Sequence, residues 1–221
     1  MPSDTEEDYL KAIYRHSGEA EELASLGKVA STVEVTAGTA TTMMKQLARQ
    51  GFVEYLPRKG VRLTEEGRIL VMKVLRRHRL LELFLVEIIK FDWSEVHEEA
   101  EVLEHAVSDR LIDRIDVMLG MPARDPHGDP IPDVDGTIRL DDSKRLDECG
   151  NGTFRLVRVT RTTPDFLEWL SAAGLQPGTI FEMLGRDILA DVFRTKVEGR
   201  AEELTFGQKV VEHLWVVPKG D

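Results

Sequence analysis

The sequence lacks several features that would indicate an extracellular or membrane protein. Its single cysteine, Cys149, excludes an intrachain disulfide and any cluster of thiolate metal ligands. No run of about 18 apolar residues is present, and the first ten residues, MPSDTEEDYL, are acidic where a signal peptide is basic and then apolar. We therefore expect a protein without a membrane span that works in the reducing cytoplasm.

The chain also lacks an excess of positive charge, since its formal net charge is −11 over 221 residues. A negative net charge argues against nucleic-acid binding only if the negative charge is distributed evenly over the protein. Residues 1–75 carry 10 basic and 11 acidic side chains, and residues 36–62 carry five basic side chains against Glu54 alone. A local basic surface of this kind is compatible with contact to phosphate.

The pattern of the first 64 residues predicts a winged helix-turn-helix domain. Helices are expected at 6–16, 23–33 and 37–50, with Gly51 in the usual position after a helix end. Strand-like runs at 52–56 and 61–64 flank a Pro-Arg-Lys-Gly turn. Helix, short helix, turn, helix and hairpin is the order of that DNA-binding fold.

The helix expected at 37–50 and the hairpin tip carry the candidate DNA contacts. Hydroxyls, methyls and an amide able to contact base edges or phosphates are offered by Thr36, Thr39, Thr41, Thr42 and Gln46. Candidate phosphate contacts are Lys45, Arg49, Arg58 and Lys59. We assign no guanine-reading arginine here, so sequence readout is expected to be modest and partly based on DNA shape. Each basic residue alone could equally be a solvated surface charge.

The rest of the chain predicts two further domains. A helix at 65–89 has apolar residues on more than one face, which suggests a central helix that also packs against a second subunit. Two more helices are expected at 95–107 and 109–119. We expect a mainly α protein with β structure: a winged helix-turn-helix domain (1–64), a helical dimerisation and metal-binding domain (65–120), a Pro/Gly/Asp-rich linker (121–150) and a small SH3-like barrel (151–221) with one helix at 165–173.

Metal-ligand residue types gather on these helices. Four donors within 95–107 fall on an arc of about 100° beside an apolar stripe, and they are His97, Glu101, Glu104 and His105. His78 and Glu82 are spaced i, i+4 on the long helix, and Asp8 is a further candidate on the first helix. Nitrogen and oxygen donors of this kind suit a first-row divalent cation. The alternative is a set of solvated helix faces with i, i+4 ion pairs.

Three other histidines have no such neighbours in the sequence. We expect surface or structural roles for His16, His127 and His213. Cys149, in the linker, is expected to be a free and inert thiol.

Four motifs give the chain a resemblance to a known family. They are Arg-His-Arg-Leu-Leu-Glu at 77–82, Glu-His-Ala-Val-Ser-Asp at 104–109, Asp-Pro-His-Gly-Asp-Pro-Ile-Pro at 125–132 and Gly-Leu-Gln-Pro-Gly-Thr at 174–179. Together with the winged-helix order, they resemble the diphtheria toxin repressor family of metal-dependent transcriptional regulators over nearly the whole chain.

The resemblance implies two metal sites per subunit. The effector site carries over to Asp8, Glu101, Glu104 and His105, and the ancillary site to His78, Glu82 and His97, completed by Asp165 from the SH3-like domain. The iron-sensing branch has methionine and cysteine at the first two effector positions, where this chain has carboxylates as in the manganese-sensing branch. Carboxylates in place of sulfur harden a site, which favours Mn²⁺, with Fe²⁺ close in chemistry.

The chain departs from the family pattern at a few positions. Short manganese regulators use a glutamate where this chain has Lys11, and a cation cannot be a ligand, so we do not expect an adjacent second ion there. Some relatives have a glutamate at the position that Thr162 occupies in this chain. Asp125 stands where some relatives have a cysteine; it could ligate, although we favour an acidic linker residue.

The sequence therefore predicts a homodimeric, Mn²⁺-responsive (or Fe²⁺-responsive) repressor that binds a double-stranded DNA operator and controls metal-uptake genes. Metal would join the first helix, through Asp8, to the dimer core and fix the spacing of the two recognition helices. Two alternatives remain open at this point. One is a metallohydrolase using the His/Glu cluster, although no nucleophile motif is evident. The other is a winged-helix regulator that answers an organic ligand.

Overall fold

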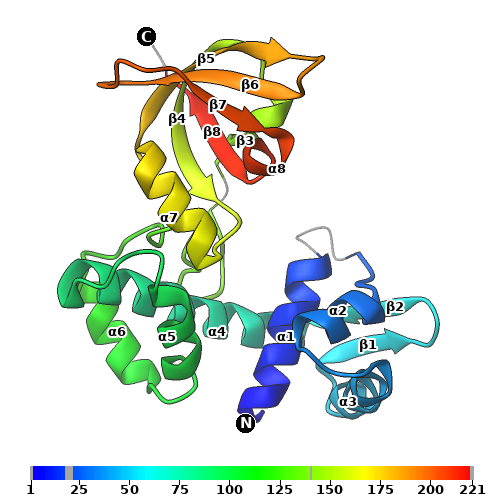
Figure 1. Cartoon of the computed structure of the whole chain (residues 1–221). Helices are drawn as coiled ribbons and strands as arrows, with labels where there is room; N and C mark the ends of the chain where they lie inside the picture. The colour runs from blue at the N-terminus through cyan, green and yellow to red at the C-terminus, as the bar shows by residue number, and fades with distance from the viewer. Residues whose placement is uncertain (1, 18–21, 140, 220–221) are drawn as a thin grey trace. The chain divides into compact units, whose positions relative to one another are not determined.

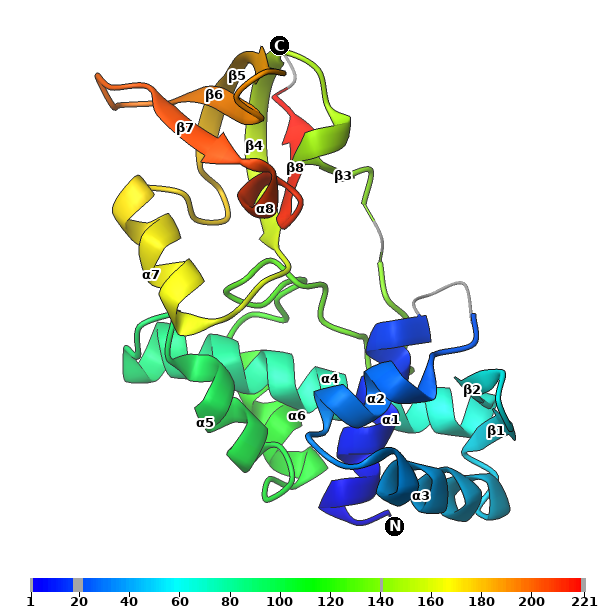
Figure 2. The ribbon, with the colours of Figure 1, turned by 45° about the vertical axis from the view of Figure 1, so that its right-hand side comes forward.

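The computed structural model describes residues 2–17, 22–139 and 141–219. The chain divides into two compact units. The first contains residues 1–78, 104–107 and 132–138, and the second contains residues 79–103, 108–131 and 139–221. The elements of each unit are labelled in Figures 1 and 2.

The first unit contains the expected winged helix-turn-helix. Helices α1 (Asp4–Ser17), α2 (Leu26–Thr32) and α3 (Ala37–Arg49) precede the antiparallel hairpin of β1 (Val53–Leu56) and β2 (Gly60–Leu63). The helices and the hairpin enclose one apolar core, whose fully buried members include Leu10, Ile13, Val29, Ala40, Met44, Leu47 and Val61. The order predicted for residues 1–64 is confirmed, with element ends shifted by up to three residues.

Residue Ala24, just before α2, extends the hairpin by one bridge. Its backbone N–H and carbonyl both pair with Val61, at N···O distances of 2.8 and 3.0 Å. The neighbouring Gly60 has φ of +146°, and a Cβ at this position would lie 2.6 Å from the carbonyl oxygen of Ala24. Glycine is therefore required where the wing crosses the segment that leads into α2.

The long helix expected at 65–89 changes its winding near its end. Helix α4 (Glu65–Phe84) is followed by a π-helical turn, η1 (Leu85–Ile89), which ends at Lys90 with φ of +71°. Helix α6 (Asp109–Met118) begins at Ser108, whose side-chain oxygen accepts a hydrogen bond from the backbone N–H of Leu111. This N-cap confirms the start expected for that helix.

One expected helix is shorter than predicted. Helix α5 runs from Val96 to Leu103, and residues 104–106 form a turn. The prediction that His97, Glu101, Glu104 and His105 share one helix face is therefore wrong. The physical reason is tertiary: Glu104 is fully buried and makes contacts with Lys11 and His78 in the first unit, which helical periodicity cannot anticipate.

The second unit carries a six-stranded antiparallel sheet in the order β3-β8-β4-β5-β6-β7. Its strands are β3 (Lys144–Arg145), β4 (Gly152–Val159), β5 (Ile180–Asp187), β6 (Val192–Val197), β7 (Leu204–Gly207) and β8 (Leu214–Pro218). Helix α7 (Pro164–Ala173) connects β4 to β5, and the short helix α8 (Gln208–Val211) connects β7 to β8 (Figure 1). A 3-10 turn, η2 (Leu146–Glu148), follows β3.

The sheet has alternating burial along its strands, as the expected small barrel requires. Its core includes Leu156, Phe181, Phe206 and Val216, joined by Leu167 and Leu170 from α7. One difference from the sequence reading lies at the end of the expected linker. Lys144 and Arg145 pair with Val216 and Trp215, so the last residues of 121–150 belong to this sheet.

Within residues 2–17, 22–139 and 141–219, no helix is both long enough and apolar enough to cross a bilayer.

Candidate metal centre and DNA-binding surface

The first group of potential metal ligands lies within the first unit and consists of Asp8, Glu104 and His105, hereafter the amino-terminal donor group. One ligand atom from each of these residues lies within 4.8 Å of the others. The Nε2 atom of His105 is 3.2 Å from Oδ1 of Asp8 and 3.5 Å from Oε1 of Glu104. Helix α1 supplies Asp8, and the turn after α5 supplies the other two residues. Asp8 and the distant neighbours Glu104 and His105 thus present two carboxylates and one imidazole to a common point.

Charged neighbours surround the amino-terminal donor group. Glu104, which is 0% exposed, has Nζ of Lys11 2.6 Å from Oε1 and Nδ1 of His78 2.6 Å from Oε2. Glu7 has Oε2 2.9 Å from Nδ1 of His105 and 3.7 Å from Nη1 of Arg77. Each buried carboxylate here is therefore paired, as the cost of burying charge demands.

The imidazole of His105 is held in a protonation state that a metal would change. Burial by itself lowers the pKa of His105, but the hydrogen bond to Glu7 and the negative charges of Glu104, Asp8 and Glu7 outweigh it and raise the pKa above the ordinary value. A ligating nitrogen must be deprotonated, so metal binding at this group would release a proton.

The second group lies within the second unit and consists of Glu82, Asp125 and His127, hereafter the linker donor group. All three residues are buried, and one ligand atom of each lies within 4.8 Å of the others. The Nδ1 atom of His127 is 3.6 Å from Oε2 of Glu82, and Oε1 of Glu82 is 3.1 Å from Nδ1 of His97. The group thus combines two carboxylates with one imidazole and has a second imidazole beside it.

The ring of His127 is oriented as in a metal ligand. Its Nε2 atom is 2.8 Å from the carbonyl oxygen of Trp93, so Nε2–H donates and Nδ1 is directed toward Glu82. The indole of Trp93 stacks on the imidazole, with ring centroids 5.6 Å apart. A backbone carbonyl that fixes one ring nitrogen is the usual outer contact of a ligating histidine.

A tight turn places Asp125 and His127 next to each other. The Oδ1 atom of Asp125 accepts hydrogen bonds from the backbone N–H groups of His127 and Asp129, both at 2.9 Å. Gly128 has φ of +87°, and a Cβ there would lie 1.9 Å from the carbonyl oxygen of Val157. Only glycine fits this position, so the Asp-Pro-His-Gly-Asp motif encodes the turn that presents both ligands.

The linker donor group holds protons more strongly than isolated side chains do. Burial, together with the charges of Asp129 and Glu82, raises the pKa of Asp125 to about 8. Burial lowers the pKa of His127, but hydrogen bonding to Glu82 and the charges of Glu82 and Asp125 prevail and raise it to about 9. A divalent cation would replace these protons, and the donor chemistry therefore fits a metal.

Within each unit, the residues expected in the effector and ancillary sites have the following neighbours. Asp8, Glu104 and His105 come together, and His78 joins them through Glu104. Glu82 and His97 lie beside His127, and Glu101 in the same unit has Oε1 3.7 Å from Nε2 of His97. That Glu101 and Asp8 belong to the same metal site stays a prediction.

Asp165 lies in none of the donor groups that the described residues form. Its side chain is 77% exposed and has Oδ2 3.8 Å from Nη2 of Arg161. Its role in a metal site likewise stays a prediction.

The sequence reading missed His127 as a potential ligand and favoured a plain acidic linker residue at Asp125. In the structure both residues are buried beside Glu82, where they could ligate an ion, and their role as ligands stays a prediction. The signal that could have found them is the turn motif itself, in which two donors flank a proline and precede a glycine. His16 and His213 contact Thr32 and Thr160 respectively, and their expected surface or structural roles stay a prediction. Cys149 is a free, half-buried thiol with a pKa raised by burial.

The candidate DNA contacts form one exposed surface on α3. Thr36 is the N-cap and accepts a hydrogen bond from the backbone N–H of Thr39 at 3.2 Å. The hydroxyls of Thr41 and Thr42 donate to carbonyls one turn earlier on the helix. Thr39, Thr42, Lys45, Gln46 and Arg49 are exposed, and Thr41 is half-buried.

The wing adds a second basic point to this unit. Arg58 and Lys59 are exposed in the turn between β1 and β2, and Arg58 has φ of +67°. The backbone N–H of Lys59 donates to the carbonyl of Leu56 and closes the turn. Both cations are thus held at the tip of a short hairpin.

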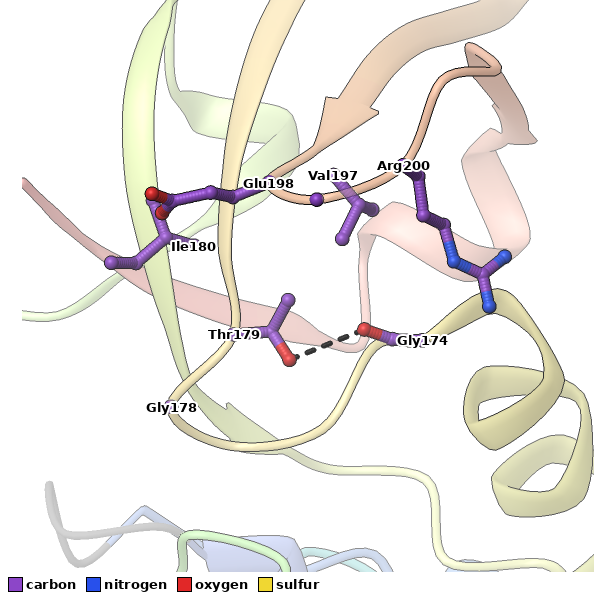
Figure 3. A pocket seen from close by; sticks show the side chains of 8 residues that line it. Gly174, Gly178, Thr179, Ile180, Val197, Glu198 and Arg200 are labelled. Atoms are coloured by element: carbon purple, nitrogen blue, oxygen red, sulfur yellow. Dashed lines mark hydrogen bonds between the residues drawn. The ribbon is translucent and has the colours of Figure 1, made fainter.

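The sheet of the second unit has a surface hollow with different chemistry. It is lined by Gly174, Gly178, Thr179, Ile180, Val197, Glu198, Gly199 and Arg200 (Figure 3). Its hydroxyl, on Thr179, donates to the carbonyl of Gly174, and Arg200 donates to the carbonyl of Ala172. Imidazole and thiol groups are not part of this lining, so the hollow resembles neither donor group.

A winged helix with a basic tip, together with His/carboxylate groups able to hold an ion, is typical of a metal-responsive DNA-binding protein. Comparison with known families agrees. Residues 1–61 match the family described as "Iron dependent repressor, N-terminal DNA binding domain", and residues 64–133 match "Iron dependent repressor, metal binding and dimerisation domain".

Individual relatives extend the match over most of the chain. The diphtheria toxin repressor of Corynebacterium efficiens is 31% identical over 194 residues, covering 82% of this chain and 83% of that protein. The diphtheria toxin repressor of Corynebacterium diphtheriae is 35% identical over 197 residues, covering 83% and 86%. The chain belongs to the diphtheria toxin repressor family of metal-dependent, DNA-binding transcriptional repressors.

Solved structures show the same fold, including the carboxy-terminal sheet. A manganese-dependent transcriptional repressor in complex with manganese is 37% identical, with a TM-score of 0.89 over 96% of this chain and 99% of that one. The manganese regulator SloR is 32% identical, with a TM-score of 0.78 over 97% and 98%. The expected fold class is confirmed: a winged helix-turn-helix, a helical dimerisation and metal-binding domain and an SH3-like domain.

Proposed function

We propose that this protein is a manganese-activated repressor that acts in the cytoplasm on metal-uptake genes, with Fe²⁺ as an alternative activator. The observation that carries the proposal is the composition of the two donor groups. Asp8, Glu104 and His105, and likewise Glu82, Asp125 and His127, offer only oxygen and nitrogen. Hard donor sets of this kind suit Mn²⁺ better than softer ions. The neighbours that bear manganese in their descriptions support the same choice.

The amino-terminal donor group is the proposed effector site. Asp8, Glu104 and His105 would hold a divalent ion, which would supply positive charge to the two carboxylates. Asp8 then holds α1 against the turn that carries Glu104 and His105. Leu10 and Ile13 of α1 pack in the same core as Ala40 and Met44 of α3. Fixing α1 therefore stabilises the position of the recognition helix, and the gain in DNA affinity is bounded by the difference in metal affinity between the two states.

The linker donor group is the proposed second site, in place of a set completed by Asp165. Its buried ligands and fixed imidazole favour a site that stays occupied and stabilises the second unit. His97, 3.1 Å from Glu82, is available as a further ligand by the same chemistry.

DNA binding is assigned to the exposed surface of α3 and to the wing. Thr36, Thr39, Thr41, Thr42 and Gln46 are the proposed contacts to bases and nearby phosphates. Lys45, Arg49, Arg58 and Lys59 are the proposed phosphate contacts. As a homodimer, the repressor would present two such surfaces to a double-stranded operator. Exposed apolar side chains on α5 and α6 support this dimer, namely Val102, Leu111, Val117 and Met118.

The division into domains at 1–64, 65–120, 121–150 and 151–221 remains part of this proposal. The family matches, which change at residues 61–64 and end at 133, support its first boundary and favour a metal-binding domain that extends into the expected linker. The pairing of β3 with β8 favours an earlier start for the SH3-like domain.

The two alternative functions have less support. A metallohydrolase needs an open coordination position beside a substrate pocket, and the lining of the surface hollow contains one carboxylate, Glu198, but no histidine. A regulator answering an organic ligand would leave the two buried donor groups unexplained. We therefore propose that the protein is not an enzyme.

The test combines metal binding with DNA binding. Equilibrium dialysis against Mn²⁺, Fe²⁺ and Zn²⁺ is followed by gel shift on DNA from the protein's own promoter region, with and without a chelator. We expect Mn²⁺ to bind and to raise DNA affinity, and chelation to reverse the effect. DNA binding that is unchanged by chelation would contradict the proposal, as would hydrolytic turnover without DNA binding.

A further inference from the structure

Glu6 is a buried carboxylate that the proposed metal sites do not use. It is 5% exposed, although it lies in the first turn of α1 beside Glu7 and Asp8. Its Oε2 atom accepts a hydrogen bond from the backbone N–H of Ser3 at 2.8 Å, and its own backbone N–H donates to the Ser3 hydroxyl at 3.4 Å. These reciprocal bonds form a capping box, in which one carboxylate oxygen of Glu6 has its hydrogen-bond partner.

The other oxygen of Glu6 binds the recognition helix. Its Oε1 atom accepts hydrogen bonds from Nε2 of Gln46 at 2.8 Å and from Nε2 of Gln50 at 2.7 Å. The backbone N–H of Ser3 lowers the pKa of Glu6 against the effect of burial, and Gln50 and Gln46 lower it further. An ionised carboxylate at neutral pH thus anchors two amides on α3, and bonds to a charged acceptor are stronger than those between neutral groups.

Gln46 is exposed despite this bond and faces outward with the candidate DNA contacts. It lies one turn after Thr42 and two turns after Thr39, so the three share one side of α3. An amide has two N–H donors and one carbonyl acceptor. When one N–H is given to Glu6, the carbonyl oxygen and the second N–H remain. That pair matches the N6 donor and N7 acceptor that adenine presents in the major groove.

We propose that Glu6 is a positioning residue for DNA-sequence readout, which holds the Gln46 amide so that its remaining edge recognises adenine. The anchor has two consequences. The long glutamine side chain loses its rotamer freedom before it meets DNA, so less entropy is lost on binding. The anchor also lies in the same helical turn as Glu7 and Asp8, whose carboxylates contact His105. The inference rests on the proposed function, because an ion that orders this turn would also order the amide.

The experiment selects binding sites from a random DNA library with the full-length protein in the presence of Mn²⁺. The wild type is compared with Glu6→Ala, Gln46→Ala and the double variant. Ser3→Ala is the matched control, because it breaks the capping box without removing the acceptor of the glutamines. Circular dichroism and thermal unfolding verify that each variant is folded. If Glu6→Ala does not fold, Glu6→Gln, which keeps the size and one acceptor oxygen, replaces it.

We expect one position of the selected site to prefer adenine by roughly tenfold. Gln46→Ala and Glu6→Ala should both reduce that preference to near unity, the double variant should add no further loss, and Ser3→Ala should keep it. Replacement of that adenine by 7-deazaadenine should weaken only those proteins that retain the preference. An adenine preference that survives Glu6→Ala, or a loss equal to that of Ser3→Ala, would overturn the inference. A wild-type protein that selects no site in Mn²⁺ would instead contradict the proposed function.

Discussion

The two donor groups contain the same residue types, two carboxylates and one histidine, yet their surroundings differ. In the amino-terminal donor group the Asp8 side chain is 43% exposed, and Lys11 lies 2.6 Å from Glu104. In the linker donor group all three side chains are buried, and a turn and a backbone carbonyl fix the imidazole. Equal ligands therefore do not imply equal roles.

The difference indicates which group can respond to metal. A partly exposed carboxylate such as Asp8, on the first turns of a helix, can be gained or lost as a ligand at small cost. A buried, preorganised set binds with less reorganisation and is expected to stay filled. We therefore propose that the amino-terminal donor group is the switch and that the linker donor group stabilises the structure.

The largest expected effect is at the amino-terminal donor group. Glu104→Gln or His105→Ala removes a direct ligand, so we expect Mn²⁺ affinity of this group to fall by about 100-fold or more and Mn²⁺-stimulated DNA binding to disappear. Calorimetric titration and gel shift measure the two quantities. Glu99→Gln, at an exposed position on α5, is the matched control. An unfolded or monomeric product would show that the two residues are structural.

The next effect is the pH dependence of the linker donor group. The pKa values of Asp125 and His127, about 8 and about 9, are both raised, so both groups are protonated at pH 7. Two protons must leave when Mn²⁺ binds, and the apparent affinity should rise with pH by up to about 100-fold per unit below pH 8, then less steeply. Titrations between pH 6 and 8.5 measure this slope.

Two variants make the pH prediction specific. In His127→Ala, the slope of Mn²⁺ affinity against pH should correspond to about one proton fewer released on binding. The Mn²⁺ affinity itself should also be weaker. In His105→Ala the slope assigned to the linker donor group should persist. A binding constant that does not change across this range would exclude Asp125 and His127 as ligands.

A smaller effect of opposite sign is expected for Lys11. Its ammonium shares Glu104 with any incoming cation and adds positive charge beside it. We expect Lys11→Gln to raise Mn²⁺ affinity of the amino-terminal donor group by roughly tenfold. Lys73→Gln, an exposed lysine of the same unit, controls for a general change in charge. Weaker binding in Lys11→Gln would mean that the lysine orients Glu104 rather than competing with metal.

The smallest effect is expected for Asp165. Its exposed side chain is paired with Arg161, and solvent screens both charges. We expect Asp165→Ala to lower the Mn²⁺ affinity of the linker donor group by no more than about threefold, because exposed charges interact weakly. Unchanged stoichiometry and affinity would remove Asp165 from the ligand set that the family resemblance implies. A loss as large as that of His127→Ala would restore it as a full ligand.

Much of the fold could be predicted from local sequence signals. The Gly51 helix end, the Ser108 cap and the Pro-Arg-Lys-Gly turn each act through neighbouring backbone atoms, and the structure has all three where the sequence placed them. The candidate DNA surface followed from the same signals, because exposure on α3 is set by its apolar periodicity. These local signals are sufficient to predict the order of helices and strands in the winged helix.

The donor groups could be predicted only in part. His78, Glu82, His97, Glu104 and His105 were recognised from helical spacing and resemblance, but the spacing assumed that α5 continues beyond Leu103. Burial of Glu104 against Lys11 and His78 overrides that local preference. Asp125 and His127 were undervalued because a loop has no periodicity from which to infer a shared direction.

The sequence by itself determined the class of this protein: an acidic chain with a locally neutral winged helix, nitrogen and oxygen donors, and no thiolate cluster. Those properties depend on residue types and on neighbours within one turn of chain. Only the tertiary structure decided which donors meet, that Lys11 pairs with Glu104, and that Glu6 anchors Gln46. The Lys11–Glu104 and Glu6–Gln46 contacts join residues 93 and 40 positions apart, and no pattern of neighbouring residues encodes a contact over such a separation.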